Sequence, residues 1–205
     1  MKTKSILILL LAITVAVSLS SFIKPVATEK FVVDSKLSSL TWTGKKVTGE
    51  HTGNVQLVSG ELSLENKVVT QGNFEIDMTT ITVTDVTDKG SNEKLVNHLK
   101  GDDFFGVAKF PKANLILSSI SKKTGDEFNV KGKLTIKGIS NDVEFPAVIV
   151  RDGKTLTATA KIIVDRTKFD IKFRSTNFFE NLGDKAIYND FELAVKLVAT
   201  SKTGA

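Results

Sequence analysis

Only a few residues in this sequence have types and spacings that could support catalysis or metal binding. Asp102 and Asp103 are adjacent carboxylates that could act in acid–base chemistry, but their position after an expected helix favours a role in closing that helix. His51 follows Glu50 and has no second histidine four residues further on, so the zinc-binding pattern H-E-x-x-H is absent. The chain contains no cysteine, and the G-x-S-x-G and P-loop patterns are also missing. We therefore expect no catalytic residues, no metal and no cofactor.

The remaining candidates are one histidine and two arginines, each with two interpretations. His98 lies near the end of the expected helix, where its ring could contact the polar headgroup of a ligand or cap free carbonyl groups. Arg166 and Arg174 could likewise meet a headgroup at the mouth of a binding site. Alternatively, the two arginines form surface ion pairs with Asp165 and Asp170. The sequence leaves both interpretations open.

The elements that would position these residues are mostly β-strands. From residue 31 onward, apolar and polar residues alternate in short runs separated by Gly, Asn and Asp, as in antiparallel strands. The expected strands are Phe31–Asp34, Leu40–Val47, His51–Leu64, Lys67–Asp77, Ala113–Lys122, Glu127–Ile136, Asn141–Arg151, Thr155–Val164 and Asp190–Ala199. Leu95 and Leu99 are four residues apart and predict one short helix, Ser91–Lys100, which ends at Gly101.

This pattern predicts an all-β fold whose strands have one apolar and one wet face. In the strand 127–136, Phe128, Val130, Leu134 and Ile136 fall on one face and lysines fall on the other. About eight such strands with short loops fit a closed antiparallel barrel, because closure removes exposed strand edges. The 13 Phe against one Trp and one Tyr favour an apolar interior and exclude the aromatic belts of an outer-membrane barrel. Periodicity does not decide whether side chains fill the interior or whether it encloses a ligand cavity.

The N-terminal 22 residues have the pattern of a secretory signal peptide. Lys2 and Lys4 precede an apolar run, Ile6–Val17, which is too short to span a bilayer and is followed by serines. Residues 23–30 are then a tether, and residues 31–200 form one barrel domain. Without the two leading lysines, the formal charge falls from +5 to +3 and is spread along the chain, so we expect no nucleic-acid partner. We expect a periplasmic or secreted protein whose mature chain has no integral membrane span.

Several segments of the chain are similar to a known family. The segment Leu95–Ser119 reads LVNHLKGDDFFGVAKFPKANLILSS: a helix ending in His-Leu, an Asp-Phe-Phe turn, an aromatic-Pro pair and a strand. Three further segments, Gly49–Leu62, Val130–Pro146 and Asp165–Phe173, agree in order, and so does the final strand IYNDFELAVKLVA. Together they resemble the YceI-like family of periplasmic, polyisoprenoid-binding proteins over nearly all of Phe31–Ala199.

The resemblance implies a lipocalin-like antiparallel barrel of about eight strands with a helix near one end. Its interior would be an elongated apolar pore for an isoprenoid quinone, a polyprenyl chain or a fatty amide. Val55 stands where the family commonly has an aromatic residue, so a pore of different shape is expected there. Phe104 and Phe105 would line the pore or plug the end of the barrel. We assign the pore wall to Trp42, Val55, Phe74, Ile76, Phe104, Phe105, Leu115, Leu117, Leu134, Ile136, Phe145 and Phe173.

These observations predict an exported carrier of an isoprenoid or another long-chain lipid that has no reaction of its own, and they leave a homodimer open. Two alternatives belong to other classes of protein. A lipid-modifying enzyme would need a polar reactive cluster inside the pore. A structural or stress-response module would have a filled barrel and would bind through its outer loops.

Overall fold

The computed structural model describes residues 28–66 and 68–202, so the expected signal peptide and residues 23–27 of the expected tether lie outside the described residues. The strands are β1 Thr28–Val33, β2 Ser39–Lys46, β3 Gly49–Glu65, β4 Val68–Asp77, β5 Lys112–Lys122, β6 Glu127–Ile136, β7 Ile139–Asp152, β8 Thr155–Asp165 and β9 Ile187–Ser201. The helix α1 spans Lys89–Lys100, and the short 3-10 helices are η1 Met78–Thr80, η2 Arg166–Phe169 and η3 Gly183–Lys185.

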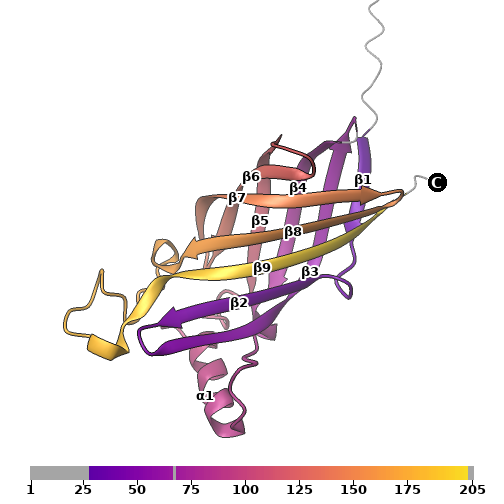
Figure 1. Ribbon diagram of the computed structural model, residues 1–205. Coiled ribbons are helices and arrows are strands. Elements are labelled where there is room, and N and C mark those ends of the chain that lie inside the picture. The colour runs from indigo at the N-terminus through magenta and orange to yellow at the C-terminus, as the bar shows by residue number, and fades with distance from the viewer. Residues whose placement is uncertain (1–27, 67, 203–205) are drawn as a thin grey trace, which may run out of the picture.

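The strands close into one antiparallel barrel (Figure 1). β3 pairs with β4 on one side and with β2 on the other, and the pairing continues through β9, β8, β7, β6 and β5 back to β4. β1 pairs with the last part of β3 and with the end of β9, beyond the parts of these strands that pair with β2. β1 and β2 therefore share one of eight positions around the barrel. The expected all-β barrel of about eight strands with one short helix is confirmed.

The alternation of apolar residues explains why these strands form a barrel. Buried and exposed positions alternate along β4 and β6, so one face of each strand contributes to a common interior. Phe31, Leu64 and Leu156 are almost fully buried near the end that carries β1, and Phe169 is fully buried near the end that carries α1. The core therefore runs along the whole length of the barrel.

Most element boundaries differ from the sequence prediction by one to three residues, and β6 alone of the described strands matches at both ends. β1 begins at Thr28, so the last three residues of the expected 23–30 tether belong to a strand that pairs with β3. The helix begins at Lys89 rather than Ser91, because the side chain of Asp88 accepts a hydrogen bond from the Ser91 backbone N–H at 2.9 Å and caps it.

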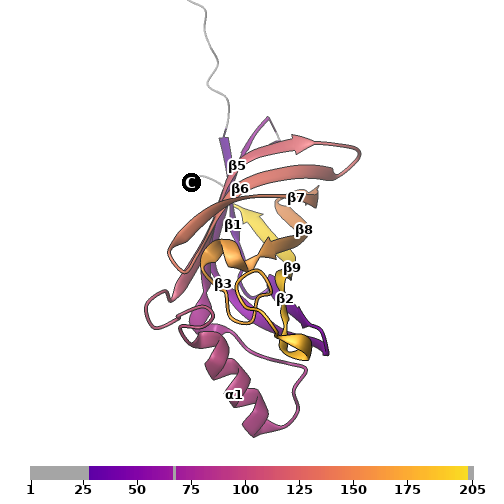
Figure 2. The ribbon, with the colours of Figure 1, turned by 90° about the vertical axis from the view of Figure 1, so that its left-hand side faces the viewer.

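A short segment between β4 and α1, residues 80–86, covers an edge of β3, and we call it the edge strap. β4 pairs with β3 only from Gln56 onward, which leaves the first part of β3 without a strand on that side. The backbone N–H groups of Thr82 and Thr84 donate to the carbonyl oxygens of Asn54 and Thr52, both at 2.9 Å. The strap then leads into α1, which projects below one end of the barrel (Figure 2).

Candidate ligand-binding site

The barrel encloses two cavities. One, which we call the distal cavity because it lies away from α1, has a volume of about 80 Å³. The other, the helix-end cavity, has a volume of about 100 Å³ and includes the α1 residue Leu99 in its wall. The side chains that line both cavities form a waist between them: Leu40, Ile76, Leu134 and Leu193. Because protein cores leave few voids larger than a water molecule, this interior is incompletely filled by its own side chains.

The walls of the distal cavity are almost entirely apolar. Among its lining residues, Thr159 is the one with a polar side chain. Four residues that the sequence assigned to a pore wall lie here and not in the helix-end cavity: Phe74, Leu115, Leu117 and Phe145. Leu115 and Leu117 are partly exposed although they face the interior of a closed sheet. Both line the distal cavity, which could take an apolar chain, and Leu117 also borders a groove on the outside of the barrel.

The helix-end cavity is also lined by apolar surface. The assigned residues that line it alone are Trp42, Val55, Phe104, Phe105 and Ile136, while Ile76 and Leu134 of the same assignment lie at the waist. Phe104 and Phe105 thus lie in the cavity wall at the helix end of the barrel. Arg166, Tyr188 and Asp190 are among its lining residues, but the Arg166 guanidinium is bonded to backbone carbonyls, and Tyr188 and Asp190 are exposed on the outside of β9.

Phe173, His98 and Arg174 lie outside both linings. The ring of His98 meets the rings of Phe104 and Phe173 edge-on, with centroid distances of 5.0 and 4.7 Å. The imidazole Nε2 lies 3.1 Å from the Asp103 carboxylate, so the side chain contacts this acid rather than the helix carbonyls. The guanidinium of Arg174 lies over the Phe173 ring at 5.1 Å. This aromatic cluster packs on the outer side of Phe104 and supports the cavity wall from behind.

Arg166 is buried. It therefore lies neither at the mouth of a binding site nor on the surface, the two positions expected from the sequence. Its residue exposure is 4%, and its guanidinium donates to the backbone carbonyl oxygens of Ile171, Ile187 and Tyr188 at 2.8 to 3.0 Å. Burial lowers the pKa of Arg166, and the nearby charge of Asp165 opposes that shift. Arg166 joins η2 to the start of β9.

The expected surface ion pairs of the two arginines are not formed. Asp165 instead accepts a hydrogen bond from the Thr167 backbone N–H at 2.9 Å and caps η2. Asp170 forms an ion pair with Lys172 at 2.7 Å. Both aspartates are therefore used within their own loop, because a neighbour two residues away reaches them more readily than a long arginine side chain.

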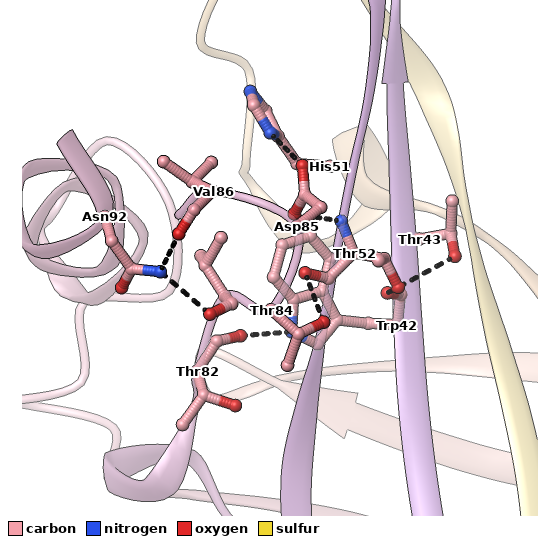
Figure 3. A network of polar contacts seen from close by, with 10 residues as sticks. Trp42, Thr43, His51, Thr52, Thr82, Thr84, Asp85, Val86 and Asn92 are labelled. Atoms are coloured by element: carbon pink, nitrogen blue, oxygen red, sulfur yellow. Dashed lines mark hydrogen bonds and ion pairs between the residues drawn. The ribbon is translucent and has the colours of Figure 1, made fainter. Parts of the chain in front are cut away.

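A polar network outside the barrel fixes the edge strap against the wall of the helix-end cavity (Figure 3). Asp85 accepts from the Thr52 backbone N–H at 2.9 Å and lies 2.8 Å from His51 Nδ1. Partial burial raises the pKa of Asp85, but the hydrogen bonds from Thr52 and His51 outweigh it and lower the pKa below its ordinary value. His51 is not part of a metal-binding motif in the sequence. In the structure its partner is Asp85 of the edge strap.

The same network connects the strap to α1 and to the barrel. Nδ2 of Asn92, in the first turns of α1, donates to the carbonyl oxygens of Val83 and Val86, both at 2.9 Å. Trp42 Nε1 donates to the Thr82 carbonyl oxygen at 3.1 Å. Figure 3 shows these bonds converging on the strap from both sides. The indole that lines the cavity is therefore held in one orientation by the strap.

Neither a metal cluster nor a membrane-spanning helix is present in the described part of the chain. Residues 28–66 and 68–202 contain no group of three or more His, Cys, Asp or Glu side chains placed to hold a metal ion. In the same residues, no helix has the length and hydrophobicity needed to cross a bilayer.

Some residues of the site were absent from the sequence assignment. Leu40 and Leu193, which form half of the waist, stand on the apolar faces of expected strands and could have been found by that alternation. Ala158 and Ala160 also line the distal cavity. Small side chains give a weak hydrophobic signal, so alternation alone does not mark these two positions as parts of a wall.

A closed antiparallel barrel with apolar cavities defines a class of proteins that bind small apolar molecules in the barrel interior. The family model described as YceI-like domain matches residues 31–199, and the chain belongs to the YceI-like family. A UPF0312 protein of Staphylococcus aureus (strain USA300) is 40% identical over 89 residues, which are 40% of this chain and 49% of that protein. Protein YceI of Salmonella arizonae is 39% identical over 56 residues, 27% of this chain and 29% of that protein. The match with the first of these relatives spans about half of its length.

Two solved structures share the fold. BcnA of Burkholderia cenocepacia matches with a TM-score of 0.65 at 23% sequence identity, covering 82% of this chain and 99% of that chain. A polyisoprenoid binding domain from Saccharophagus degradans, implicated in plant cell wall breakdown, matches with a TM-score of 0.60 at 10% identity, covering 86% of this chain and 99% of that chain. At such identities the likeness establishes the architecture of the barrel.

Proposed function

We propose that this protein binds and carries a long-chain amphiphile, such as an isoprenoid, inside the barrel. The observation that carries the proposal is the pair of apolar cavities separated only by the waist side chains Leu40, Ile76, Leu134 and Leu193. Transfer of a chain from water into such walls gains about 0.8 kcal/mol for each buried methylene group, before the entropy of ordering the chain is subtracted. A tail that occupies both cavities would be held without any charged contact.

The polar residues near the two cavities favour one direction for the bound molecule. The distal cavity has only Thr159 among its lining residues as a polar side chain, whereas Arg166, Tyr188 and Asp190 stand around the helix-end cavity. We therefore place the polar headgroup beyond the apolar wall of the helix-end cavity. For the tail to pass the waist, the side chains there must change rotamer, and three of the four are leucines, which lack the branched Cβ of Ile76.

Three further observations support the proposal. Two favour binding over catalysis, and one favours a location outside the cytoplasm. The similar domain of Saccharophagus degradans is named for polyisoprenoid binding. The most polar wall residue, Arg166, already donates to three backbone carbonyls, which suits a structural and headgroup-contacting role more than proton transfer. The basic and apolar pattern of residues 1–22 is that of an export signal and favours a periplasmic or secreted protein.

The experiment uses Trp42, the single tryptophan of the chain and a wall residue of the helix-end cavity, as a reporter. Protein purified without detergent is extracted with organic solvent, and the extract is analysed by mass spectrometry. Delipidated protein is then titrated with geranylgeraniol, a twenty-carbon isoprenoid alcohol, while Trp42 emission is recorded. We expect a lipid in the extract and a saturable, stoichiometric change in emission. An empty extract together with a non-saturable titration would overturn the proposal.

A filled-barrel variant supplies the control. Ala158→Phe places a large side chain in the distal cavity, whereas Thr157→Phe places it on the outer face of the same strand. We expect geranylgeraniol binding to be lost in A158F and kept in T157F, with the same circular dichroism spectrum for both. Equal binding by the two folded variants would show that the tail does not enter the distal cavity.

A further inference from the structure

The strands β7 and β8 pair along only part of their lengths. Their register runs from Ala147↔Ala160 to Asp152↔Thr155. Within the described chain, residues 139–146 of β7 pair with β6 alone, and residues 161–165 of β8 pair with β9 alone. Farther toward the helix end, Asn141 Nδ2 donates to the Lys168 carbonyl oxygen at 2.8 Å. This bond connects β7 to η2, which directly follows β8. We call the interval between these limits, residues 142–146 and 161–164, the seam.

Pro146 gives the physical reason for the seam. The β6–β7 turn consists of Lys137 and Gly138, both with positive φ, which defines a two-residue hairpin closed by the pair Ile136↔Ile139. In such a hairpin, the backbone groups of alternate residues point away from the partner strand, and on β7 these are the even-numbered residues. Position 146 would therefore direct its N–H toward β8, but proline has none. The ladder ends at the residue that cannot donate.

At the end of this ladder, the barrel wall is thin. An outer groove runs over β2, β9, β8 and β7, and it includes Pro146 and Lys161 in its lining. The residues that line both this outer groove and the distal cavity are Ala147, Thr159, Ala160 and Val195. Two of these four side chains are single methyl groups. The distal cavity and the outer groove are thus separated by small side chains. These lie next to the point where the backbone pairing between β7 and β8 ends.

An exposed aliphatic patch lies beside the seam at its distal limit. Ile163 in the seam is 55% exposed, and Val148 and Val150 on the paired part of β7 are 40% and 44% exposed. The other outward-facing residues of the seam are Pro146 and the charged Asp142, Glu144 and Lys161. The aliphatic patch offers a surface along which an apolar chain can slide before it enters.

Both ends of the barrel offer less room. At the distal end, Phe31 is fully buried, Arg151 lies over its ring at 5.2 Å, and Arg151 is ion-paired with Glu29 at 2.7 Å. At the helix end, Leu99 and Phe104 are buried against the helix-end cavity. A ligand that enters through either end must displace packed side chains. Opening the seam also moves the buried side chains of Phe145 and Ile162, but it breaks no backbone pairing between β7 and β8.

We propose that the seam is the entrance through which the apolar tail of the ligand passes sideways into the distal cavity. This inference rests on the proposed carrier function and adds the route of loading. Lateral entry admits the tail along its side, so a long chain need not be threaded end-first through the barrel. The aliphatic patch of Val148, Val150 and Ile163 beside the seam fits an aliphatic or isoprenoid chain that is donated from an apolar phase.

The test joins the two strands across the seam. The chain has no cysteine, so Glu144→Cys with Ile163→Cys introduces the only two thiols. These outward-facing residues lie opposite each other across the seam when the β7–β8 register is continued, and Pro146 stays in place. A short bis-maleimide then links them. The matched control is Val150→Cys with Thr157→Cys, two outward-facing residues that the ladder already pairs. The rate of geranylgeraniol loading is followed by stopped-flow emission of Trp42, before and after linking.

We expect linking at 144 and 163 to slow loading at least about tenfold and linking at 150 and 157 to change it less than about twofold. The final emission amplitude should be equal in both. Unchanged loading after linking of the seam, or equal slowing in both variants, would overturn the lateral route and place the entrance at a barrel end. A wild-type protein that gives no amplitude at all would instead contradict the carrier function.

A second pair of variants avoids cross-linking. Pro146→Val restores the missing N–H and allows the ladder to extend toward the helix end, while Pro111→Val changes a proline outside the seam. We expect P146V alone to slow loading and to gain hydrogen-exchange protection at residues 161–164. Faster or unchanged loading in a P146V protein that has gained this protection would also overturn the proposal.

Discussion

Trp42 Nε1 donates a hydrogen bond to the Thr82 carbonyl oxygen at 3.1 Å, and Gly53 makes the approach of these two groups possible. Gly53 lies opposite Trp42 in the β2–β3 ladder. A Cβ atom at position 53 would overlap the Thr82 carbonyl oxygen and would lie 2.9 Å from Trp42 Cε2. The edge strap is therefore seated directly on the backbone of β3, and the orientation of the cavity-lining indole depends on that seating.

The first prediction concerns this glycine. Gly53→Ala should displace the edge strap and lower the free energy of unfolding by about 1–3 kcal/mol, as overpacking does in other proteins. Gly44→Ala is the control, because a Cβ atom there would have no neighbour closer than 3.9 Å, the Trp42 ring. Urea unfolding followed by circular dichroism measures both. Equal stability of the two variants would contradict the proposed seating.

The second prediction concerns the buried cation. Arg166→Met leaves the carbonyl oxygen of Ile171, just after η2, and those of Ile187 and Tyr188 in β9 without their donor, so we expect a loss of about 3 kcal/mol or more in unfolding free energy. Arg166→Lys should recover only part of this loss, since one ammonium group cannot reproduce the geometry of a guanidinium fork. Chemical denaturation of the three proteins is the measurement. A stable R166M protein would mean that the carbonyls find other partners.

The third prediction concerns the waist. Leu134 is 4% exposed and lines both cavities, so Leu134→Ala should join them and cost about 2–5 kcal/mol of stability. Ile116→Ala on the neighbouring strand removes an outward side chain that is 54% exposed and should cost about 0.5 kcal/mol or less. Because the waist separates the cavities, L134A should still bind geranylgeraniol. Loss of binding in folded L134A would show that this leucine holds the ligand instead.

The fourth prediction concerns pH. The folded-state pKa of Asp85 is lowered, so its ionised form stabilises the fold at pH values above its unfolded pKa of about 4, and this contribution is lost as the pH falls through the folded pKa. Asp85→Asn should therefore destabilise the protein by about 1 kcal/mol or less at pH 7, given the partial exposure of the carboxylate. The difference from wild type should shrink toward pH 3.

Urea unfolding of D85N and wild type at the two pH values tests this prediction. Asp126→Asn, in the exposed β5–β6 turn, is the matched control and should behave as wild type at both. A difference between D85N and wild type that grows as the pH falls would contradict the sign of the effect.

The strands and most of the pore wall could be predicted because they depend on local patterns. Alternation with a period of two places Phe74 and Leu115 on inner faces, and the structure brings them to one cavity. Phe173 carries an equally strong apolar signal but lies behind Phe104 against His98. It follows η2, where the chain leaves the sheet, so strand periodicity does not determine the direction of its side chain.

Other features depend on distant segments and could not be predicted from local patterns. Arg166 is close in sequence to Asp165 and Asp170, which favoured surface pairing, yet the carbonyls that bind it include Ile187 and Tyr188, about twenty residues further on. Residues 79–88 interrupt the strand pattern, and only their contact with β3 shows that part of this interruption is an edge strap.

The sequence by itself determined the all-β class, the apolar inner face and the family, because strand periodicity and ordered motifs are properties of neighbouring residues. Only the tertiary structure decided that the interior is two cavities separated by a waist and that the wall carries a seam. Closure of the barrel sets these features, since the space left inside and the pairing across Pro146 depend on strands that lie far apart in the chain.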